Sequence, residues 1–450
     1  MFKRVVVANR GAVAARVIRC LREMGIESVA VFSEADQDAP YLKEASSAYP
    51  IGPAPALESY LNQEAILKVV RDSGADGLHP GYGFLAENAG FAANVMKSGC
   101  HFIGPAPKWL EAMSHKTEAR RMMGERGMPM CPATGVIPAE GGDAARLASE
   151  IGYPVLVKPA NGGGGIGMLP ARDSEELLKA LERSRAIAAR SFAQGEVYLE
   201  KLLEKPRHVE LQVLADTAGQ VRHLHERDCS VQRRHQKVIE EAPAPGIARG
   251  EIESLAETIT AILAGMGYDN IGTVEMLYTP GAGFNFIEVN TRLQVEHAVS
   301  EAVTGVDLVA AQIRSAAGLP LSDILPERIP MEGHAVEARI YAEDPVRFFP
   351  SPGTLETFRL NEEAGVRVET GFAEGMTVTP HYDPMLAKVI AHGENRQAAI
   401  EKLAHALGGM EISGVKTNIP FLLKMLADEA FLAGRVHTGL TDEVVKKPVT

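Results

Sequence analysis

The sequence predicts an α/β protein of several domains. Three features carry this prediction: a strand–helix–strand pattern at the N-terminus, a glycine-rich loop after a strand, and a hairpin with several carboxylates. The chain has 450 residues, and at roughly 100 to 200 residues per domain it should hold two to four domains. An apolar run at 5–8 is followed by a helical pattern at 12–24, closed by Gly25, and by a second apolar run at 29–32. This order predicts a parallel sheet, and we interpret residues 1–113 as a Rossmann-like domain.

Two further regions follow the first. Residues 114–330 alternate between helical and strand patterns, with a glycine cluster at 162–167 and a hairpin at 273–290. The proline-rich stretch 319–330 is typical of a linker. The last region, 331–446, begins with strands and finishes in helical segments. We therefore expect three domains with boundaries near residues 113 and 330.

The composition narrows the class of protein. Hydrophobic residues make up 46% of the chain, charged residues 23%, and the formal net charge is −12. An acidic surface argues against nonspecific nucleic-acid binding. The four cysteines are far apart and form no CxxC pair, which favours a reducing cytosol over disulfides or a zinc knuckle. The N-terminal apolar run is too short for a signal peptide, and no run approaches the roughly 20 apolar residues of a membrane span. We expect a cytoplasmic protein without nucleic-acid or membrane partners.

The glycine-rich loop follows a strand at 155–158 that ends in Lys158. Gly162, Gly163, Gly164 and Gly165 are consecutive, and such a run costs backbone entropy. A flexible surface loop is one explanation. A loop whose N–H groups approach phosphate oxygens is the other, and we favour it because the lysine offers a cation to the same phosphates. The pattern is neither a Walker A loop nor a dinucleotide fingerprint.

The hairpin presents oxygen ligands. Side chains on a strand alternate between faces, so we expect Phe284, Phe286, Glu288, Asn290 and Arg292 to share one face. If Tyr278 pairs with Asn285, Glu275 lies opposite Glu288. A slip of one residue would move Glu275 to the other face. Two carboxylates and an amide suit Mg²⁺ bound to the phosphates of ATP, whereas a single glutamate would more simply be a solvent-facing side chain.

Two neighbouring segments add charge. Residues 290–297 contain Arg292, which is suited to hold an anion, and Glu296, which is suited to act as a general base, whereas we interpret His297 as structural. Residues 227–237 carry five potential cations in eleven residues. In an acidic protein such a cluster suggests an anionic ligand, and a solvated charged turn is an equally good interpretation.

Long motifs of the chain resemble biotin carboxylase, and the resemblance covers about residues 1 to 440. It implies a Rossmann-like N-terminal domain, a central ATP-grasp domain with a mobile lid at about 131–203, and a C-terminal biotin carboxylase domain. The motifs are Ala8–Gly11, His79–Asn88, Arg227–Gly246, Glu288–His297, Gly333–Ile340 and Ala342–Pro345.

The resemblance also implies the roles of individual residues. Glu275, Glu288 and Asn290 would bind Mg²⁺ or Mn²⁺, Glu296 would be the base, Arg339 would stabilise the enolate of biotin, and Tyr82 would lie near the biotin ring. Bicarbonate would be bound by Lys237, Arg292, Gln294 and Val295. The ATP site would be lined by Lys116, Lys158, Gly162, Gly163, Gly164, Gly165, Glu200, Lys201, Leu203, His208, Gln232, His235, Glu275, Leu277 and Glu288.

The implied reaction is the ATP- and bicarbonate-dependent carboxylation of biotin. Bicarbonate would attack the γ-phosphorus to give carboxyphosphate, which would break down to CO₂ and phosphate. The phosphate would then deprotonate biotin. The chain has no segment resembling the Ala-Met-Lys-Met attachment site, so biotin should arrive on a carboxyl carrier protein, and a carboxyltransferase should accept the carboxyl group. The resemblance further implies a homodimer with Arg19, Glu23 and Arg367 as interface candidates, for which ordinary surface salt bridges are an alternative.

Four positions depart from the family pattern. Ile166 stands where an arginine is usual, Asn161 where a glycine is usual, Leu169 where a basic residue is frequent, and Ala12 where an acidic residue is common. Two other functions stay open: a different ATP-grasp ligase that joins a carboxylate to an amine, and a nucleotide-binding subunit without catalytic activity. The motif at 227–246 together with Arg339 argues against the ligase, and the retained acidic hairpin argues against the silent subunit.

Overall fold

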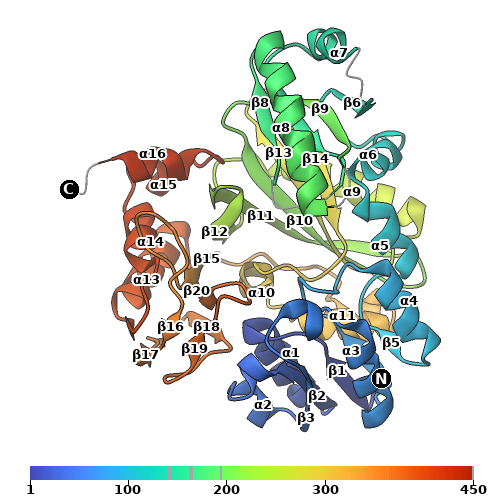
Figure 1. Ribbon diagram of the computed structural model, residues 1–450, viewed down its shortest axis with the longest axis vertical. Coiled ribbons are helices and arrows are strands. Elements are labelled where there is room, and N and C mark those ends of the chain that lie inside the picture. Colours follow the sequence, from blue (N-terminus) through green and yellow to red (C-terminus); the bar gives the residue numbers. More distant parts are fainter. Residues whose placement is uncertain (139–142, 162–165, 193–194, 362, 448–450) are drawn as a thin grey trace.

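The structure is a computed structural model that describes residues 1–138, 143–161, 166–192, 195–361 and 363–447. Helices and strands are mixed, which confirms the predicted α/β class. Figure 1 shows the N-terminal sheet at the bottom, a large central sheet above it, a small sheet at the top, and the C-terminal helices to the left.

The N-terminal sheet is parallel, with the strand order β3-β2-β1-β4-β5. Valines of β1 are fully buried, as expected for a strand with helices on both faces of its sheet. The predicted strand–helix–strand unit is present, with its helix starting at Gly11. The elements are β1 (Arg4–Val7), α1 (Gly11–Glu23), β2 (Glu27–Ser33), α2 (Tyr41–Glu44), β3 (Ser47–Gly52), α3 (Gln63–Ser73), β4 (Gly77–His79), α4 (Ala89–Lys97) and β5 (His101–Phe102).

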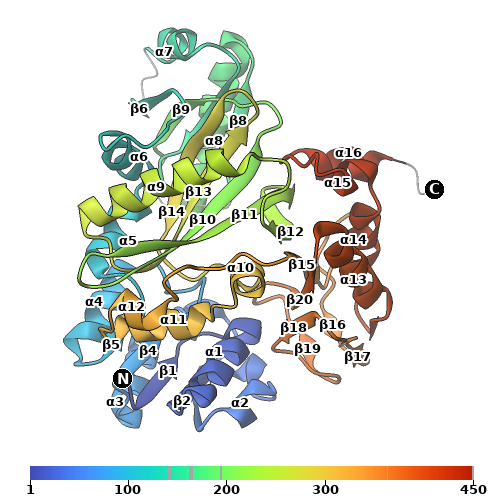
Figure 2. The same cartoon turned by 180° about the vertical axis from the view of Figure 1, so that it is seen from behind.

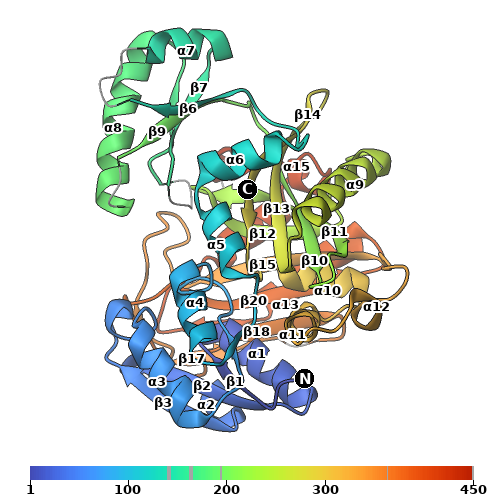
Figure 3. The same cartoon turned by 90° about the vertical axis from the view of Figure 1, so that its right-hand side faces the viewer.

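A small antiparallel sheet of order β6-β9-β7-β8 stands apart from the rest of the protein (Figure 3). Its own apolar cluster packs Val155, Val157 and Leu199 against α8. Two helices, α5 (Pro107–Ser114) and α6 (Lys116–Gly124), precede it. Its elements are β6 (Ala133–Ile137), α7 (Ala144–Ile151), β7 (Val155–Pro159), β8 (Leu169–Ala171), α8 (Ser174–Phe192) and β9 (Val197–Lys201).

The large sheet has eight antiparallel strands in the order β14-β13-β10-β11-β12-β15-β20-β18. Figure 2 shows α9 (Arg249–Met266) lying across the face of this sheet that is turned away in Figure 1. Strand β12 pairs with β15, so hydrogen bonds of one sheet cross the predicted boundary near residue 330. The strands are β10 (Arg207–Ala215), β11 (Val221–Arg233), β12 (Gln236–Ala242), β13 (Asn270–Thr279), β14 (Gly283–Asn290), β15 (His334–Tyr341), β18 (Val366–Thr370) and β20 (Met385–Gly393).

The remaining elements flank this sheet. Helix α10 (His297–Thr304) packs on one face of β15 and β20. Helix α13 (Arg396–Gly408) packs on the other face of these two strands and belongs to a separate apolar cluster. The stretch expected to be a linker contains one short helix, α12 (Leu321–Ile324). The others are α11 (Leu308–Ala316), α14 (Ile419–Leu426), α15 (Glu429–Leu432), α16 (Leu440–Lys446), and the short strands β16 (Gly353–Thr354), β17 (Thr357–Arg359), β19 (Thr377–Val378) and β21 (Glu411–Ser413).

A buried carboxylate joins three distant parts of the chain. Glu301 on α10 accepts a hydrogen bond from Arg16 of α1 at 3.0 Å and from Arg367 of β18 at 2.6 Å. Burial raises its pKa, but the charge of His297, once acid protonates that ring, and the charges of Arg16 and Arg367 lower it further, to about 2. The ionised form is therefore strongly favoured in the folded state.

We expect Glu301→Gln to make the free energy of unfolding less dependent on pH in the acidic range. A lowered pKa stabilises the fold above the unfolded pKa of about 4.3, and this stabilisation is lost as the pH falls toward about 2. Between pH 6 and pH 4 the free energy of unfolding of the wild type should fall by about 0.6 kcal/mol more than that of the variant. Urea unfolding at both pH values measures this, with the exposed Glu253→Gln as control. Parallel losses in all three proteins would contradict the assignment.

Two properties bear on the surroundings of the protein. None of the helices in the described ranges is long and apolar enough to cross a membrane. All four cysteines are buried and unpaired. Burial raises the pKa of the Cys229 thiol well above its usual value, so this sulfur stays protonated and unreactive.

Candidate active site

The register of the hairpin places Glu275 opposite Glu288, but the strand pairing that produces this arrangement differs from the predicted one. Near the turn, Tyr278 pairs with Phe284 rather than with Asn285. A register shift then follows, between Glu275 and Met276 on β13, which restores the opposition of the two glutamates. A bulge of one extra residue is a frequent device for re-aiming a side chain next to an active site.

The same bulge overturns the predicted face. Phe284, Phe286 and Val289 are all buried in the apolar cluster beneath the sheet, so the two phenylalanines do not share a face with Glu288. Strict alternation fails between Phe286 and Glu288 because the extra residue breaks the period of two. Glu288 and Asn290 do share a face, since Glu275 and Thr273 are their cross-strand partners.

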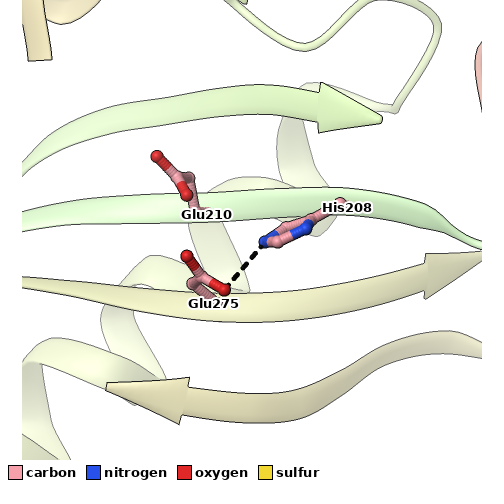
Figure 4. A group of neighbouring side chains, drawn as sticks. All are labelled: His208, Glu210 and Glu275. Atoms are coloured by element: carbon pink, nitrogen blue, oxygen red, sulfur yellow. Dashed lines mark ion pairs between the residues drawn. The ribbon is translucent and has the colours of Figure 1, made fainter. Parts of the chain in front are cut away.

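Basic side chains contact the three predicted metal ligands. Lys116 Nζ lies 2.9 Å from Glu288 Oε2, and Arg292 donates to Asn290 Oδ1 at 3.1 Å. His208 Nε2 lies 3.1 Å from Glu275 Oε2, the contact drawn in Figure 4. Carboxylate and amide oxygens are the ligands that Mg²⁺ prefers, so the donor set fits that ion.

A buried acidic cluster surrounds Lys237. Its Nζ donates to Glu210 at 2.6 Å, to Glu275 at 2.8 Å and to Glu296 at 2.6 Å. Glu210 follows His208 by two residues on β10, so both point to the same side (Figure 4). One ammonium does not balance the charge of three carboxylates, and a divalent cation would supply the additional positive charge.

Glu296 and Arg339 come together from distant parts of the chain. Arg339 Nη2 lies 3.0 Å from Glu296 Oε2 and 2.5 Å from Glu240 Oε1. Burial raises the pKa of Glu296, but Lys237, Arg339 and Arg227 lower it further, to well below its usual value. Burial raises the pKa of Glu240 to about 7, against the opposing charge of Arg339. The two carboxylates beside one guanidinium therefore differ in charge state: Glu296 is ionised, and Glu240 is partly protonated near neutrality.

The segment at 290–297 is positioned by the N-terminal domain. Glu87 accepts from the Arg292 Nε at 2.8 Å and from the backbone N–H of Thr291 at 3.1 Å. Arg292 also donates to Gln294 Oε1 at 2.9 Å. The guanidinium and the amide thus point toward the same space as Glu275, to which Gln294 donates at 3.4 Å. Burial lowers the pKa of His297 to about 4, so this ring is neutral, in line with a structural role.

The residues expected around ATP lie on both sheets. On the small sheet, Lys158 Nζ lies 3.0 Å from Glu200 Oε1. Burial by itself lowers the pKa of Lys158, but Glu200 raises it above its usual value, so the ammonium stays charged. Lys201 instead donates to the backbone carbonyls of Gly152 and Tyr153. Gly162, Gly163, Gly164 and Gly165 lie outside the described residues.

The other predicted ATP residues differ in their accessibility. Gln232 donates to the carbonyl of Cys229 and lies 2.7 Å from His208 Nδ1, so it positions that ring. Leu203 and Leu277 are half-buried, whereas His235 is exposed at the β11–β12 turn. Their contacts with ATP remain predictions. Tyr82 is half-buried, and the charges that act on its hydroxyl include those of Lys388 and Arg339.

The basic stretch is only partly a solvated turn. Arg234 and His235 are exposed. Arg227, in contrast, is fully buried and donates to Glu210 at 2.6 Å and to Gln212 at 2.8 Å. A guanidinium with this many fixed partners supports the acidic cluster and has no free donor face for a ligand.

Four residues with clear roles in the site geometry were not predicted. Glu87 lies within the quoted motif at 79–88 but received no role. Glu210 is signalled by its spacing of two from His208. Arg120 donates to the carbonyls of Cys131 and Phe286 and lies 2.7 Å from Glu200 Oε2. No local pattern marks it, or Lys388 on β20, because their partners are remote in the sequence.

A small sheet that carries Lys158 and Glu200, joined to a large antiparallel sheet that carries Glu275 and Glu288, defines the class of ATP-grasp ligases. Models of protein families match most of the chain in three parts: "Biotin carboxylase, N-terminal domain" at 1–110, "Carbamoyl-phosphate synthase L chain, ATP binding domain" at 115–324, and "Biotin carboxylase C-terminal domain" at 337–443. The chain belongs to the biotin carboxylase family, and it is an ATP-dependent ligase.

Relatives support this assignment over the full length. Biotin carboxylase 2 of Bacillus subtilis is 48% identical over 438 residues, which cover 97% of this chain and 98% of the relative. Among solved structures, the biotin carboxylase domain dimer of 2-oxoglutarate carboxylase from Hydrogenobacter thermophilus, in complex with MgADP, ADP and bicarbonate, has a TM-score of 0.95 and 42% identity, with 100% of both chains covered. Biotin carboxylase of Campylobacter jejuni in complex with β,γ-ATP also has a TM-score of 0.95, at 41% identity and with 98% and 99% covered.

The departure at Ile166 gives a direct test. Half of the Ile166 surface is exposed, so an arginine at this position has room. We expect Ile166→Arg to lower the KM for ATP, or raise turnover, by up to about fivefold, since a partly exposed ion contact supplies up to about 1 kcal/mol. Steady-state kinetics measure this, with Ile166→Gln as a polar but uncharged control. Identical kinetics for the two variants would remove the functional significance of this position.

Proposed function

We infer that this chain carboxylates biotin with ATP and bicarbonate and that the reaction is centred on Glu296, Lys237 and Arg339. The observation that carries this inference is the pair of buried contacts that Lys237 and Arg339 make to the two oxygens of Glu296, at 2.6 and 3.0 Å. The structural relative from Hydrogenobacter thermophilus holds MgADP and bicarbonate, which supports the same ligands for this protein.

The residues of the chain then have distinct tasks. Arg292, Gln294, Lys237 and the Val295 backbone would bind bicarbonate. Glu296 would accept its proton as a bicarbonate oxygen attacks the γ-phosphorus of ATP, releasing ADP and leaving carboxyphosphate. Bound Mg²⁺, held by Glu275, Glu288 and Asn290, would neutralise charge on the phosphates.

The second half of the reaction would depend on Arg339. Carboxyphosphate breaks down to CO₂ and phosphate, and the phosphate takes the ureido proton of biotin. Arg339 would stabilise the resulting enolate of biotin while the ureido nitrogen of biotin attacks CO₂. Glu240, which is partly protonated near neutrality, leaves more of the positive charge of Arg339 available to that enolate than two ionised carboxylates would.

The wider setting follows the same inference. A biotin carboxyl carrier protein would deliver biotin, a carboxyltransferase would accept the carboxyl group, and the protein would work as a homodimer in the cytoplasm. The structural relative from Hydrogenobacter thermophilus is a dimer, which supports a second copy of this chain as a partner. Arg19 and Arg367 lie near one another, since both contact Glu369. We keep the division at residues 113 and 330 as part of this proposal, supported by the boundaries of the matching family models. The lid at about 131–203 stays an expectation from the family resemblance.

The decisive experiment is ATP cleavage by the purified protein. Phosphate release should require bicarbonate and Mg²⁺ and should rise on addition of free biotin, with carboxybiotin as product. Cleavage that depends on an amine and a carboxylic acid instead of bicarbonate would identify a different ATP-grasp ligase. No phosphate release in a single turnover would identify a subunit without catalytic activity.

A further inference from the structure

Lys388 occupies a central place on the charged face of the large sheet. It lies on β20, directly opposite Arg339 of β15 on one side and Glu369 of β18 on the other. Directly opposed residues point to the same face of a sheet. This face packs against α10, and Lys388 is fully buried there. Its apolar neighbours on β20, Ala387 and Val389, belong to the cluster on the opposite face.

The ammonium of Lys388 reaches from this sheet to the segment that carries the base. Its Nζ donates to the backbone carbonyl of Val295 at 2.5 Å and lies 2.9 Å from Glu369 Oε2 and 3.5 Å from Glu337 Oε2. Lys388 thus makes one hydrogen bond, to the carbonyl of Val295, and two ion pairs, to Glu369 and Glu337. Burial lowers the pKa of Lys388, but Glu337 and Glu369 raise it above its usual value, so the donor to Val295 is charged.

The carbonyl of Val295 belongs to a tight turn. The carbonyl of Gln294 accepts from the N–H of His297 and lies 2.7 Å from its Nδ1, and the carbonyl of Glu296 accepts from the N–H of Val299. These bonds lie in the turn that leads into α10 and at the N-cap of that helix. The carbonyl of Val295 is the one bound from another element, and its donor is Lys388. The direction of the peptide bond between Val295 and Glu296 therefore depends on the sheet.

We propose that Lys388 is a positioning residue for the bicarbonate segment, acting through the carbonyl of Val295 to orient the peptide that joins it to Glu296. This rests on the proposed function, in which Gln294, Val295 and Glu296 meet bicarbonate. A charged donor suits the task because hydrogen bonds to an ionised group are shorter and stronger than neutral ones. A buried lysine is costly unless paired, and Glu369 and Glu337 supply the pairing.

The geometry also separates this role from that of Arg339. Arg339 contacts Glu296 directly, whereas Lys388 contacts this segment at the backbone carbonyl of Val295. Removing Lys388 should therefore disturb the binding of the one-carbon anion more than the binding of ATP, whose expected ligands on β7, β9 and α6 have no contact with it. A residue that merely stabilises the core would alter both affinities together, or neither.

The test compares four variants with the wild type by steady-state kinetics of bicarbonate-dependent ATP cleavage. Lys388→Met removes the donor at similar length. Lys388→Met combined with Glu337→Gln removes the donor without leaving Glu337 as a buried carboxylate that has lost its cation, whereas Glu369 keeps its contacts with Arg16 and Arg367. Lys402→Met is the matched control, because Lys402 also donates to a backbone carbonyl of this domain, that of His392 at 2.9 Å, far from residues 290–297.

For the double variant we expect the KM for bicarbonate to rise by about tenfold or more, the loss of one charge-assisted hydrogen bond, with the KM for ATP within about twofold and a melting temperature close to that of the control. Lys388→Arg should recover part of the bicarbonate affinity. Equal changes in both KM values, an unchanged KM for bicarbonate, or failure of both the single and the double variant to fold would overturn the positioning role. Absence of bicarbonate-dependent cleavage in the wild type would instead refute the proposed function.

Discussion

Glu296→Gln is expected to lower the rate of bicarbonate-dependent ATP cleavage by about 10²- to 10⁴-fold, the usual contribution of a general base. The amide keeps the shape of the side chain but cannot accept the proton of bicarbonate. ATP affinity should change by less than about threefold, because Glu296 is proposed to act at the reacting centre and not on ground-state binding. Isothermal titration with a non-hydrolysable ATP analogue and single-turnover phosphate release measure the two quantities separately.

The same substitution should also lower stability. Glu296 is fully buried between Lys237 and Arg339, and loss of its charge removes one carboxylate partner from each cation. Because Lys237 keeps Glu210 and Glu275 and Arg339 keeps Glu240, the cost should stay below the roughly 3–5 kcal/mol of an uncompensated buried charge. Thermal unfolding must therefore accompany the kinetics, so that the rate is corrected for the folded fraction. The exposed Glu411→Gln is the control. A raised KM for ATP with unchanged turnover would assign Glu296 to nucleotide binding instead.

Arg339→Met should separate the two halves of the reaction. Carboxylation of free biotin is expected to fall by about 10²- to 10³-fold, the effect of removing one group that stabilises a developing oxyanion. Bicarbonate-dependent ATP cleavage without biotin should fall less, because that step needs Glu296 and not the enolate. The ratio of carboxybiotin formed to ATP cleaved, followed with ¹⁴C-bicarbonate, reports the difference directly.

A control and a second variant sharpen this test. Arg359→Met removes an exposed arginine from the same region of the chain and should leave the ratio unchanged. Arg339→Met combined with Glu240→Gln avoids leaving Glu240 as a buried carboxylate without its cation. If both Arg339 variants lose cleavage and carboxylation in equal proportion, Arg339 serves the first step, through its contact with Glu296, and has no separate role at biotin.

Local patterns predicted those features that depend on neighbours in the sequence. The N-terminal strand–helix–strand unit is an example, because a short apolar run, a turn at Gly11 with φ of +63° and an amphipathic helix are each local. The spacing of Glu288 and Asn290 likewise predicted two oxygen ligands on one face. The long motifs allowed the family to be recognised and, with it, residues such as Lys116 and Arg339 that no periodicity marks.

Features that depend on contacts between remote segments were not predictable. The hairpin illustrates this: the two glutamates are opposite each other as expected, but through a register shift that moved Phe284 and Phe286 to the core. A bulge is decided by what the two faces of the sheet can bury, not by the alternation of one strand. The basic stretch is a second example, since Arg227 is paired with Glu210 and buried while Arg234 is exposed.

By itself, then, the sequence determined the chemistry available to this protein: a biotin carboxylase with two facing glutamates, a basic residue for each expected anion and a candidate base at Glu296. Only the tertiary structure decided how these groups act on one another, namely that Glu296 lies between Lys237 and Arg339, that Glu240 is partly protonated, and that Lys388 reaches Val295. Side-chain type and spacing are encoded locally, whereas charge state and orientation arise from burial and from partners that lie up to hundreds of residues away in the chain.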